Sequence, residues 1–329
     1  EDFEKNFAKY IGSKYAIAVG NCTDAILIAL KLLNIKKNSE IITVANTAVP
    51  TIISIINAGF TPVLVDIGDD YLIDEKKIEK LITKKTKAIL PVHLYGQSCN
   101  MTQINKLAKK YNLKIIEDCA QATGAKFNNK FVGNLGDIGC FSFYPTKVLG
   151  GFGDGGILTT NNFNIYNKIK IFRFMGINVK KKPGYAISEG INSRMDDIQA
   201  SILNFKLKKL NQYISKRNKI AEFYNENLDK SKFTIPKINK NNKHVYYEYV
   251  VAANNRSNLL KNAKKNGVNL KITYPYMIHK MKFFTKFKNP NLKTTEKLSK
   301  KIFSLPTFPE LTKSELNKIV KILNRIAYE

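Results

Sequence analysis

The stretch FSFYPTKVLGGFGDGGILTT, residues 141–160, joins an aromatic, strand-like run to a single lysine and a cluster of glycines. Lys147 stands between the aromatic residues and five glycines at positions 150–156. The segment GFGDGG matches G-x-G-x-x-G, but a dinucleotide-binding loop must open a helix, and here the β-type run ILTT follows. The chain also lacks the phosphate-binding pattern G-x-x-x-x-G-K-[ST]. The lysine therefore indicates a different chemistry.

Outward from this stretch, the first two hundred residues alternate short apolar runs with helical patterns. The alternation predicts an α/β fold, with a mainly parallel sheet and helices on both of its faces. The last two strand-like runs have no helix between them, so part of the sheet is expected to be antiparallel. The predicted strands are 15–19, 40–45, 62–67, 88–92, 114–118, 140–144 and 155–160.

The remainder of the chain predicts a second, smaller unit of mixed α and β structure. We expect a large domain at residues 1–215 and a small C-terminal α+β domain at residues 216–329. The elements predicted after the sheet are a long helix at 194–225, a strand at 246–253, a helix at 255–267 and a final helix from about residue 313.

Asp118 ends one predicted strand and Lys147 closely follows another, and ligands of such sheets bind beyond the carboxyl ends of the strands. A nucleophilic lysine such as Lys147 needs a carbonyl on a substrate or cofactor, and Asp118 ends the apolar run KIIED, where a carboxylate is unfavourable unless paired. Both are explained if Lys147 holds pyridoxal phosphate (PLP) as a Schiff base and Asp118 pairs with the protonated pyridine nitrogen.

The phosphate of such a cofactor has a natural site in the strand-to-helix turn GNCTDA, residues 20–25. Each feature has an ordinary alternative when taken singly. Lys147 could be a surface amine, Asp118 an ion-paired strand end, and the turn a simple helix cap. Together and in this order they favour the cofactor.

The chain resembles the DegT/DnrJ/EryC1/StrS family of PLP-dependent sugar aminotransferases, which have the type I aminotransferase fold. The resemblance runs nearly from end to end and is most specific where EDCAQ, SFYPTK and GDGG occur together. It is carried by FEKNFAKYIGSKYAIAVGNCTDAI (3–26), NAGFTPVLVDI (57–67), PVHLYGQ (91–97), IIEDCAQATGA (115–125), GDIGCFSFYPTKVLGGFGDGGILTT (136–160), GINSRMDDIQASIL (190–203), YPYMIH (274–279) and SLPTFPELT (304–312).

For the reacting end of the cofactor, the resemblance implies that Lys147 is the Schiff-base lysine and proton shuttle. It makes Asp118 the partner of the pyridine nitrogen and places Gln121 beside the ring and its hydroxyl. Many members have an aromatic residue after an ANT segment, where it stacks on the ring. Ala48 stands there in this chain, and His93 is the candidate substitute.

For the phosphate, the resemblance implies contacts from Ser142 and from the Cys22–Thr23 turn. Many members have glycine or serine where Cys22 stands, so backbone amides and Thr23 are expected to make that contact. Asn192 is expected to reach the same phosphate from a second subunit, which implies a homodimer with shared active sites. The ordinary alternative for Asn192 is a turn residue that caps the following helix.

The implied activity is transfer of an amino group from an amino acid, with glutamate as the expected donor, to a keto sugar carried on a nucleotide. SFYPTK, FRFMG (172–176) and EGINSRMDD (189–197) resemble members that act on dTDP-3-keto-6-deoxyhexoses more than those that act on 4-keto sugars. We therefore expect a 3-aminotransferase that makes amino sugars for surface polysaccharide, such as lipopolysaccharide O-antigen, or glycoconjugates. A 4-aminotransferase is the alternative. Sugar 3-dehydratases of the family carry histidine at the position of Lys147, which argues against that activity.

The formal net charge of +28 raises an alternative from another class, a DNA-binding regulator. However, the charge comes without an arginine-rich arm, a zinc finger or an RNA-binding motif. Segments such as KINKNNK (237–243) are typical of lysine and asparagine enrichment driven by codon usage. We therefore expect no nucleic-acid partner, and a positive field that attracts an anionic substrate.

The four cysteines are scattered and form no C-x-x-C pair, so we expect free thiols and no metal site, with Cys119 and Cys140 buried. An apolar run of 18 residues and a secretion signal are both lacking, which favours a cytoplasmic protein without a membrane contact. The chain starts at Glu1 inside a helix-like segment, so we expect its natural beginning to be missing.

Overall fold

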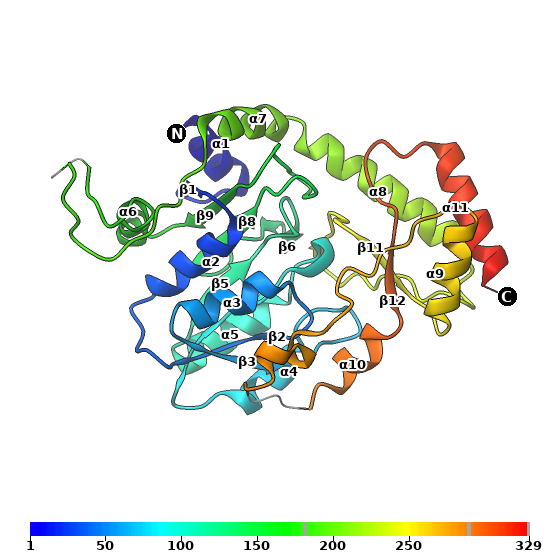
Figure 1. Ribbon diagram of the computed structural model, residues 1–329, viewed down its shortest axis with the longest axis horizontal. Helices are drawn as coiled ribbons and strands as arrows, with labels where there is room; N and C mark the ends of the chain where they lie inside the picture. Colours follow the sequence, from blue (N-terminus) through cyan, green and yellow to red (C-terminus); the bar gives the residue numbers. More distant parts are fainter. Residues whose placement is uncertain (180–182, 288–290, 328–329) are drawn as a thin grey trace.

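The computed structural model describes residues 1–179, 183–287 and 291–327. Its centre is a seven-stranded sheet in the order β1-β9-β8-β5-β4-β2-β3 (Figure 1). The strands from β8 to β3 pair in parallel, whereas β9 runs antiparallel to both of its neighbours. The predicted mixed and mainly parallel sheet is confirmed. The strands are β1 (Tyr15–Val19), β2 (Glu40–Val44), β3 (Thr61–Val65), β4 (Thr86–Ile89), β5 (Lys114–Asp118), β8 (Ile138–Ser142) and β9 (Gly156–Thr160).

Both faces of the sheet are covered, and strand β1 shows how. Ile17 and Val19 point into a core shared with α2, whereas Ala16 and Ala18 point into a core shared with α1 and α7. The sequence of a strand that is buried on both faces is a continuous apolar run, because alternate side chains enter different cores. The helices of the sheet region are α1 (Asp2–Ile11), α2 (Cys22–Lys31), α3 (Val49–Asn57), α4 (Glu75–Ile78), α5 (Met101–Tyr111), α6 (Phe163–Phe172) and α7 (Asp197–Leu207).

The single long helix predicted at 194–225 is wrong, because two helices occupy this region. Helix α7 ends at Leu207 and α8 (Leu210–Asn227) begins after a break at Lys208 and Lys209. Leu207 and Leu210, on either side of the break, are both buried in the core beneath α1. Neither glycine nor proline marks the break in the sequence.

Helix α8 connects the two units. Its first half packs Ile214 into the core beneath α1, and its second half packs Ile220 and Tyr224 into a separate core. The expected domain boundary at residues 215–216 lies inside this helix. The division into domains therefore stays a proposal.

The smaller unit is built on the antiparallel pair β11 (Tyr249–Ala252) and β12 (Ile302–Leu305). Arg217 of α8 connects two loops of this smaller unit. Its Nη1 donates to the carbonyl oxygens of Tyr246 at 3.1 Å and Thr307 at 2.5 Å. None of the helices in the described ranges is both long and apolar enough to cross a membrane. The other elements are α9 (Arg256–Lys265), α10 (Lys293–Ser299), α11 (Lys313–Ile326) and a small sheet of β6 (Lys126–Phe127), β7 (Lys130–Phe131) and β10 (Asn242–Lys243).

A buried carboxylate at the end of β3 ties α10 to the sheet. Asp66 accepts hydrogen bonds from the Thr294 and Thr295 N–H groups at 3.0 and 2.8 Å, and from Lys77 Nζ at 3.0 Å. Burial raises the pKa of Asp66, but these hydrogen bonds outweigh it and bring the pKa well below its usual range. The charged form of Asp66 is therefore part of the fold.

Candidate active site

Lys147 lies in the tight loop between β8 and β9, half-buried. Its N–H donates to the Tyr144 carbonyl oxygen at 2.8 Å, and the Phe143 N–H donates to the Gly155 carbonyl oxygen at 2.8 Å, which closes the loop on itself. The Nζ atom lies 4.7 Å from the centre of the Tyr247 ring. The amine is thus on the wall of a cavity of about 730 Å³, formed by residues 145–148, 247–248 and 304–310 together with parts of α7 and α8.

Asp118 is the last residue of β5 and is 4% exposed. The Ala120 N–H donates to Oδ1 at 3.1 Å and the Thr51 hydroxyl donates to Oδ2 at 2.8 Å. Burial raises the pKa of the Asp118 carboxyl, while these two hydrogen bonds and the charge of Lys147 oppose the rise. Within the described ranges no ion pair involves Asp118, so the carboxylate can accept a hydrogen bond from a cationic ligand.

The first turn of α2 lies close to both residues. Burial and the charge of Asp118 raise the pKa of Cys22, and the charge of Lys147 lowers it, so the three side chains are within electrostatic reach. Asn21 caps the helix by accepting the Asp24 N–H at 2.9 Å, and the N–H groups of Cys22 and Thr23 begin the helix. Such N–H groups bind anions, and the neutral Cys22 thiol adds no opposing charge.

Ser142 ends β8 at the same edge of the sheet and is 7% exposed. It is paired with Gly156 of β9. A Cβ atom on Gly156 would lie 2.5 Å from the backbone of Asn21, so only glycine allows β9 to pass so close to the start of α2. The GDGG segment therefore places the α2 turn against the sheet, which is a structural reason for glycine that has no connection with a dinucleotide.

Gln121 is held at both ends of its amide. Oε1 accepts the Tyr95 N–H at 2.7 Å, and Nε2 donates to the Tyr274 hydroxyl at 2.6 Å. Burial raises the pKa of Tyr274 most, and nearby charges, including that of Asp118, raise it further. Tyr274 therefore lies close to the same site as Asp118. Among the described residues the Gln121 Nε2 group donates only to Tyr274, so its second hydrogen can be donated to a ligand.

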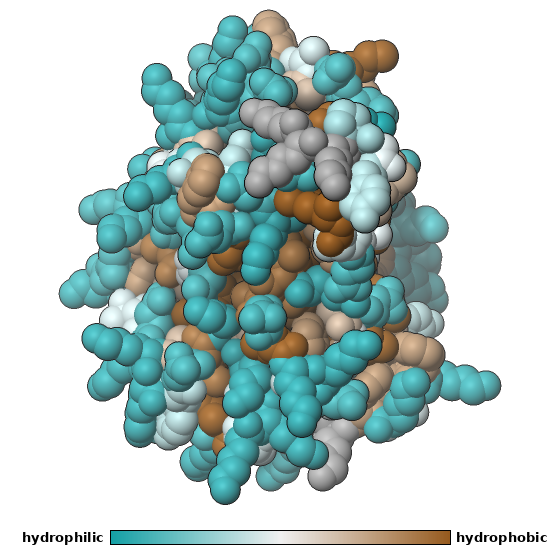
Figure 2. Space-filling view, turned by 90° about the vertical axis from the view of Figure 1, so that its left-hand side faces the viewer, coloured by the Kyte–Doolittle hydropathy of each residue, from teal (hydrophilic) through white to brown (hydrophobic). Residues whose placement is uncertain are grey.

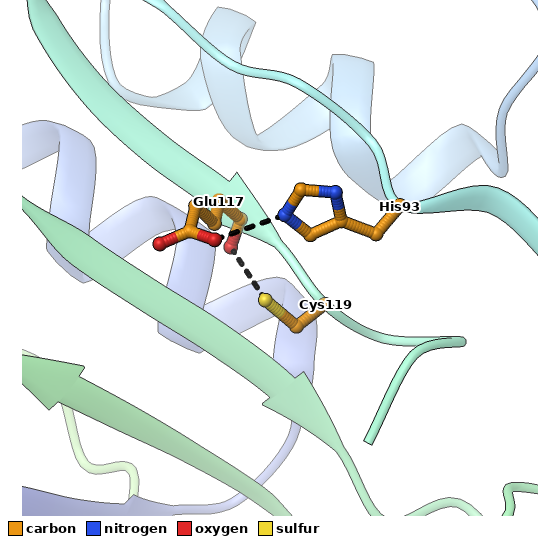
Figure 3. Close-up of side chains that lie close together, drawn as sticks. All are labelled: His93, Glu117 and Cys119. Carbon is orange, nitrogen blue, oxygen red and sulfur yellow. Dashed lines mark hydrogen bonds and ion pairs between the residues drawn. The ribbon is translucent and has the colours of Figure 1, made fainter. Parts of the chain in front are cut away.

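His93 was expected to be a candidate for stacking on the cofactor, and its position argues against that role. The ring is fully buried and both nitrogens are engaged (Figure 3). Nε2 lies 3.0 Å from Glu117 Oε2, and Nδ1 accepts the Cys99 N–H at 3.0 Å. A ring that is fully buried and bonded at both nitrogens has no exposed face to offer a ligand.

His93, Glu117 and Cys119 also lie close enough together to resemble a metal site (Figure 3). The carboxylate of Glu117 is already satisfied, because it accepts four hydrogen bonds in all. Its donors are His93 Nε2 and the N–H groups of Gly133, Leu135 and Gly136. A metal ion would have to break these bonds, so the cluster is better described as a buried hydrogen-bonding centre that holds the end of β5.

Asn192 is exposed and lies away from the Lys147 cavity. It lines a separate cavity of about 640 Å³ with Gly20, Asn21 and Asp24. Its expected phosphate contact is to a second subunit, and the single chain neither makes nor excludes it. That role stays a prediction.

Three residues beside the candidate site were not found from the sequence, namely Thr51, Tyr247 and Tyr274. Thr51 lies in the apolar helix VPTIISIIN and carries no local signal beyond being a polar residue there. The two tyrosines come from beyond α8, in segments whose distance along the chain hides their contact with the sheet. Only Tyr274 falls in a quoted family segment, YPYMIH.

Comparisons with known proteins identify the family of the chain. The DegT/DnrJ/EryC1/StrS aminotransferase family matches residues 1–324. The chain therefore belongs to this family. It is a PLP-dependent aminotransferase with the type I fold.

Two relatives match almost the whole chain. The dTDP-3-amino-3,6-dideoxy-alpha-D-galactopyranose transaminase of Aneurinibacillus thermoaerophilus is 40% identical over 329 residues, 100% of this chain and 90% of the relative. The dTDP-3-amino-3,4,6-trideoxy-alpha-D-glucose transaminase of Micromonospora megalomicea subsp. nigra is 37% identical over 338 residues, 99% and 89% of the two chains. Among solved structures, NtdA of Bacillus subtilis with bound cofactor PMP is 31% identical with a TM-score of 0.93, and the match covers 100% of this chain and 77% of NtdA.

The residues present fit PLP. An amine on a cavity wall, a buried carboxylate that can accept a cationic N–H, and a helix start lie within electrostatic reach of one another, with Asp118 and the α2 turn outside the lining of the Lys147 cavity itself. These three features correspond to the aldehyde, the pyridine nitrogen and the phosphate of the cofactor.

Proposed function

We propose that this enzyme transfers an amino group from an amino acid, with glutamate as the donor, to the 3-position of a dTDP-3-keto-6-deoxyhexose. The convergence of Lys147, Asp118 and the α2 turn supports the amino transfer. The choice of the 3-position is supported by the two relatives named above, both of which are called dTDP-3-amino sugar transaminases. A 4-keto sugar is the competing substrate.

Each residue has a defined task in the proposed reaction. PLP, when bound, supplies an electron sink for charge that develops on the donor. The Lys147 amine holds the cofactor covalently and, once released, moves a proton to or from the α-carbon of the donor. Asp118 keeps a proton on the pyridine nitrogen, and the N–H groups of Cys22 and Thr23 bind the phosphate with Ser142.

The role of Lys147 can be tested directly. Borohydride reduction of the purified enzyme, followed by peptide mapping, should place the pyridoxyl label on Lys147. Lys147→Ala should bind the cofactor without a covalent link and lose turnover by orders of magnitude. A label on another lysine would overturn the assignment.

The substrate needs a separate experiment. A panel of 3-keto and 4-keto nucleotide sugars, each offered with glutamate and with other amino donors, should give the highest kcat/KM with a dTDP-linked 3-keto sugar and glutamate. Preference for a 4-keto sugar would leave the aminotransferase chemistry intact and correct only the position. With either sugar, the amino sugar would serve a surface polysaccharide or glycoconjugate made from cytoplasmic precursors.

We also propose that two copies of the chain form a homodimer with shared active sites. Phe152 of the glycine loop is 76% exposed, and Ile198 and Phe205 of α7 are 74% and 59% exposed. The Phe152 N–H donates to Gln199 of α7 at 2.9 Å, so these apolar groups share one surface. A second copy would cover them, since large apolar patches are uncommon on monomers.

Further apolar side chains are exposed at Met175, Val179, Tyr185 and Ile187. Figure 2 faces the side of the molecule on which α6 lies, and it shows hydrophobic residues exposed between hydrophilic ones. Light scattering should report a dimer, and Ile198→Glu should weaken it.

Sharing of the sites has its own test. Asn192→Ala and Lys147→Ala should each reduce activity, and a mixture of the two variants should recover activity that neither has alone. Recovery is expected because one site of the mixed dimer then contains both native residues. No recovery from a mixed dimer would show that each chain completes its own site.

A further inference from the structure

We propose that Thr51 is a positioning residue for Asp118, holding its carboxylate charged and correctly oriented toward the cofactor. The geometry that carries this inference is a chain of two buried hydroxyl groups. Thr51 Oγ1 lies 2.8 Å from Asp118 Oδ2, and Thr47 Oγ1 lies 2.8 Å from Thr51 Oγ1. Thr47 and Thr51 are 3% and 1% exposed.

The direction of both hydrogen bonds follows from the chemistry of the acceptor. A charged carboxylate can only accept, so the Thr51 hydrogen must point at Asp118. Thr51 Oγ1 is then free to accept, and Thr47 becomes its donor. Hydrogen bonds aligned in this way polarise one another, which strengthens the final bond to the carboxylate.

The other groups around Asp118 show why this bond matters. The Ala120 N–H is the only other neutral donor to its carboxylate among the described residues. Burial raises the pKa of Asp118, and the electrostatic effects of Lys147 and His93 lower it. The side chains of Cys22, Cys140 and Tyr274 also lie near Asp118. Loss of the Thr51 hydroxyl would therefore remove one of two neutral donors that favour the charged carboxylate.

A predictable change in the bound cofactor follows. With a more basic Asp118, the proton shared with the pyridine nitrogen moves toward the carboxylate. With the cofactor bound, the ring would then carry less positive charge, and the Lys147 nitrogen would hold its proton more tightly. The apparent pKa of the visible absorbance band should rise, and turnover should fall because the ring is a weaker electron sink.

The test compares Thr51→Val with Thr51→Ser in the full-length holoenzyme. Valine has almost the shape of threonine but no hydroxyl, whereas serine keeps the hydroxyl and lacks the methyl group. Thr51→Val should raise the apparent pKa of the visible band by about one unit and lower kcat about tenfold to a hundredfold, with a much smaller change in KM for the amino donor. Thr51→Ser should resemble the native enzyme in all three measurements.

Two further variants keep the inference falsifiable if Thr51→Val folds poorly. Thr51→Ala can be compared with Thr51→Ser, since these differ only by the hydroxyl. Thr47→Val should shift the band in the same direction by less, because it removes only the polarising donor. An unchanged band pKa in both Thr51→Val and Thr51→Ala, with normal circular dichroism, would overturn the proposal. A common loss of activity in the valine, alanine and serine variants would also overturn it, as the hydroxyl would not be the cause.

This inference rests on the proposed role of Asp118, and the two can fail separately. If Asp118→Asn leaves the band and the turnover unchanged, the assignment of Asp118 itself is wrong. If Asp118→Asn is strongly impaired while Thr51→Val behaves as the native enzyme, only the role of Thr51 is refuted.

Discussion

Replacing His244 by asparagine should make the stability of the protein less sensitive to acid. His244 lies in the segment that also carries Tyr247, the ring nearest the Lys147 amine. Its imidazole is 6% exposed, stacks on Tyr246 with ring centroids 4.1 Å apart, and accepts the Tyr246 N–H at Nδ1 at 2.8 Å. Burial lowers the pKa of His244 to about 3. A proton on Nδ1 would also remove the acceptor of the Tyr246 N–H.

The size of the effect follows from the difference between the two pKa values. Because the pKa in the folded protein is below the value of about 6.5 in the unfolded chain, the unfolded chain takes up the proton first as the pH falls. The contribution to stability is complete above pH 6.5 and is lost progressively as the pH falls toward 3. Between pH 8 and pH 5 the expected loss from this one group is about 2 kcal/mol.

Urea denaturation at pH 8 and pH 5 measures this loss. The chain has no tryptophan, so far-UV circular dichroism is the suitable probe. In His244→Asn the amide oxygen can still accept the Tyr246 N–H, but the titrating group is gone. The variant should be less stable at pH 8, having lost the ring stacking, and should lose about 2 kcal/mol less than the native protein on going to pH 5. Equal losses in both proteins would refute the reasoning.

Other outcomes can be checked with simpler assays. Asp118→Asn should retain the cofactor but lose most turnover, because the uncharged amide cannot stabilise the protonated pyridine nitrogen; near-native kcat would contradict this. Asp66→Ala should lower the free energy of unfolding by at least about 1.5–3 kcal/mol at neutral pH, and the difference from native should shrink below about pH 4, where the unfolded carboxyl is protonated. Tyr274→Phe should free the Gln121 amide and accelerate cofactor release, as measured by fluorescence during dilution. DNA binding should be weak and lost at moderate salt, whereas a sequence-specific complex at physiological salt would revive the regulator alternative.

The sequence alone predicted the sheet and the two residues on which the proposed chemistry depends. Strands buried on both faces must be continuous apolar runs, and the chain shows them at nearly the observed positions. Since the carboxyl ends of parallel strands lie at one edge of a sheet, the sequence predicts that Asp118 and Lys147 lie near each other. The resemblance to the family then connected these residues with PLP.

Tertiary structure decided the contacts between distant segments. Thr51 and Asp118 are 67 residues apart in the chain, and Gln121 and Tyr274 are 153 apart, so no local pattern relates them. His93 lies just beyond the end of β4, yet its ring turns into the core toward Glu117 rather than toward the cavity. Likewise, α7 ends at Leu207 and α8 begins at Leu210 without a glycine or proline at the break, so no local signal in the sequence reports it. Periodicity and turn residues report the local conformation of a chain, whereas the partner of a buried polar group depends on which distant segment packs against it.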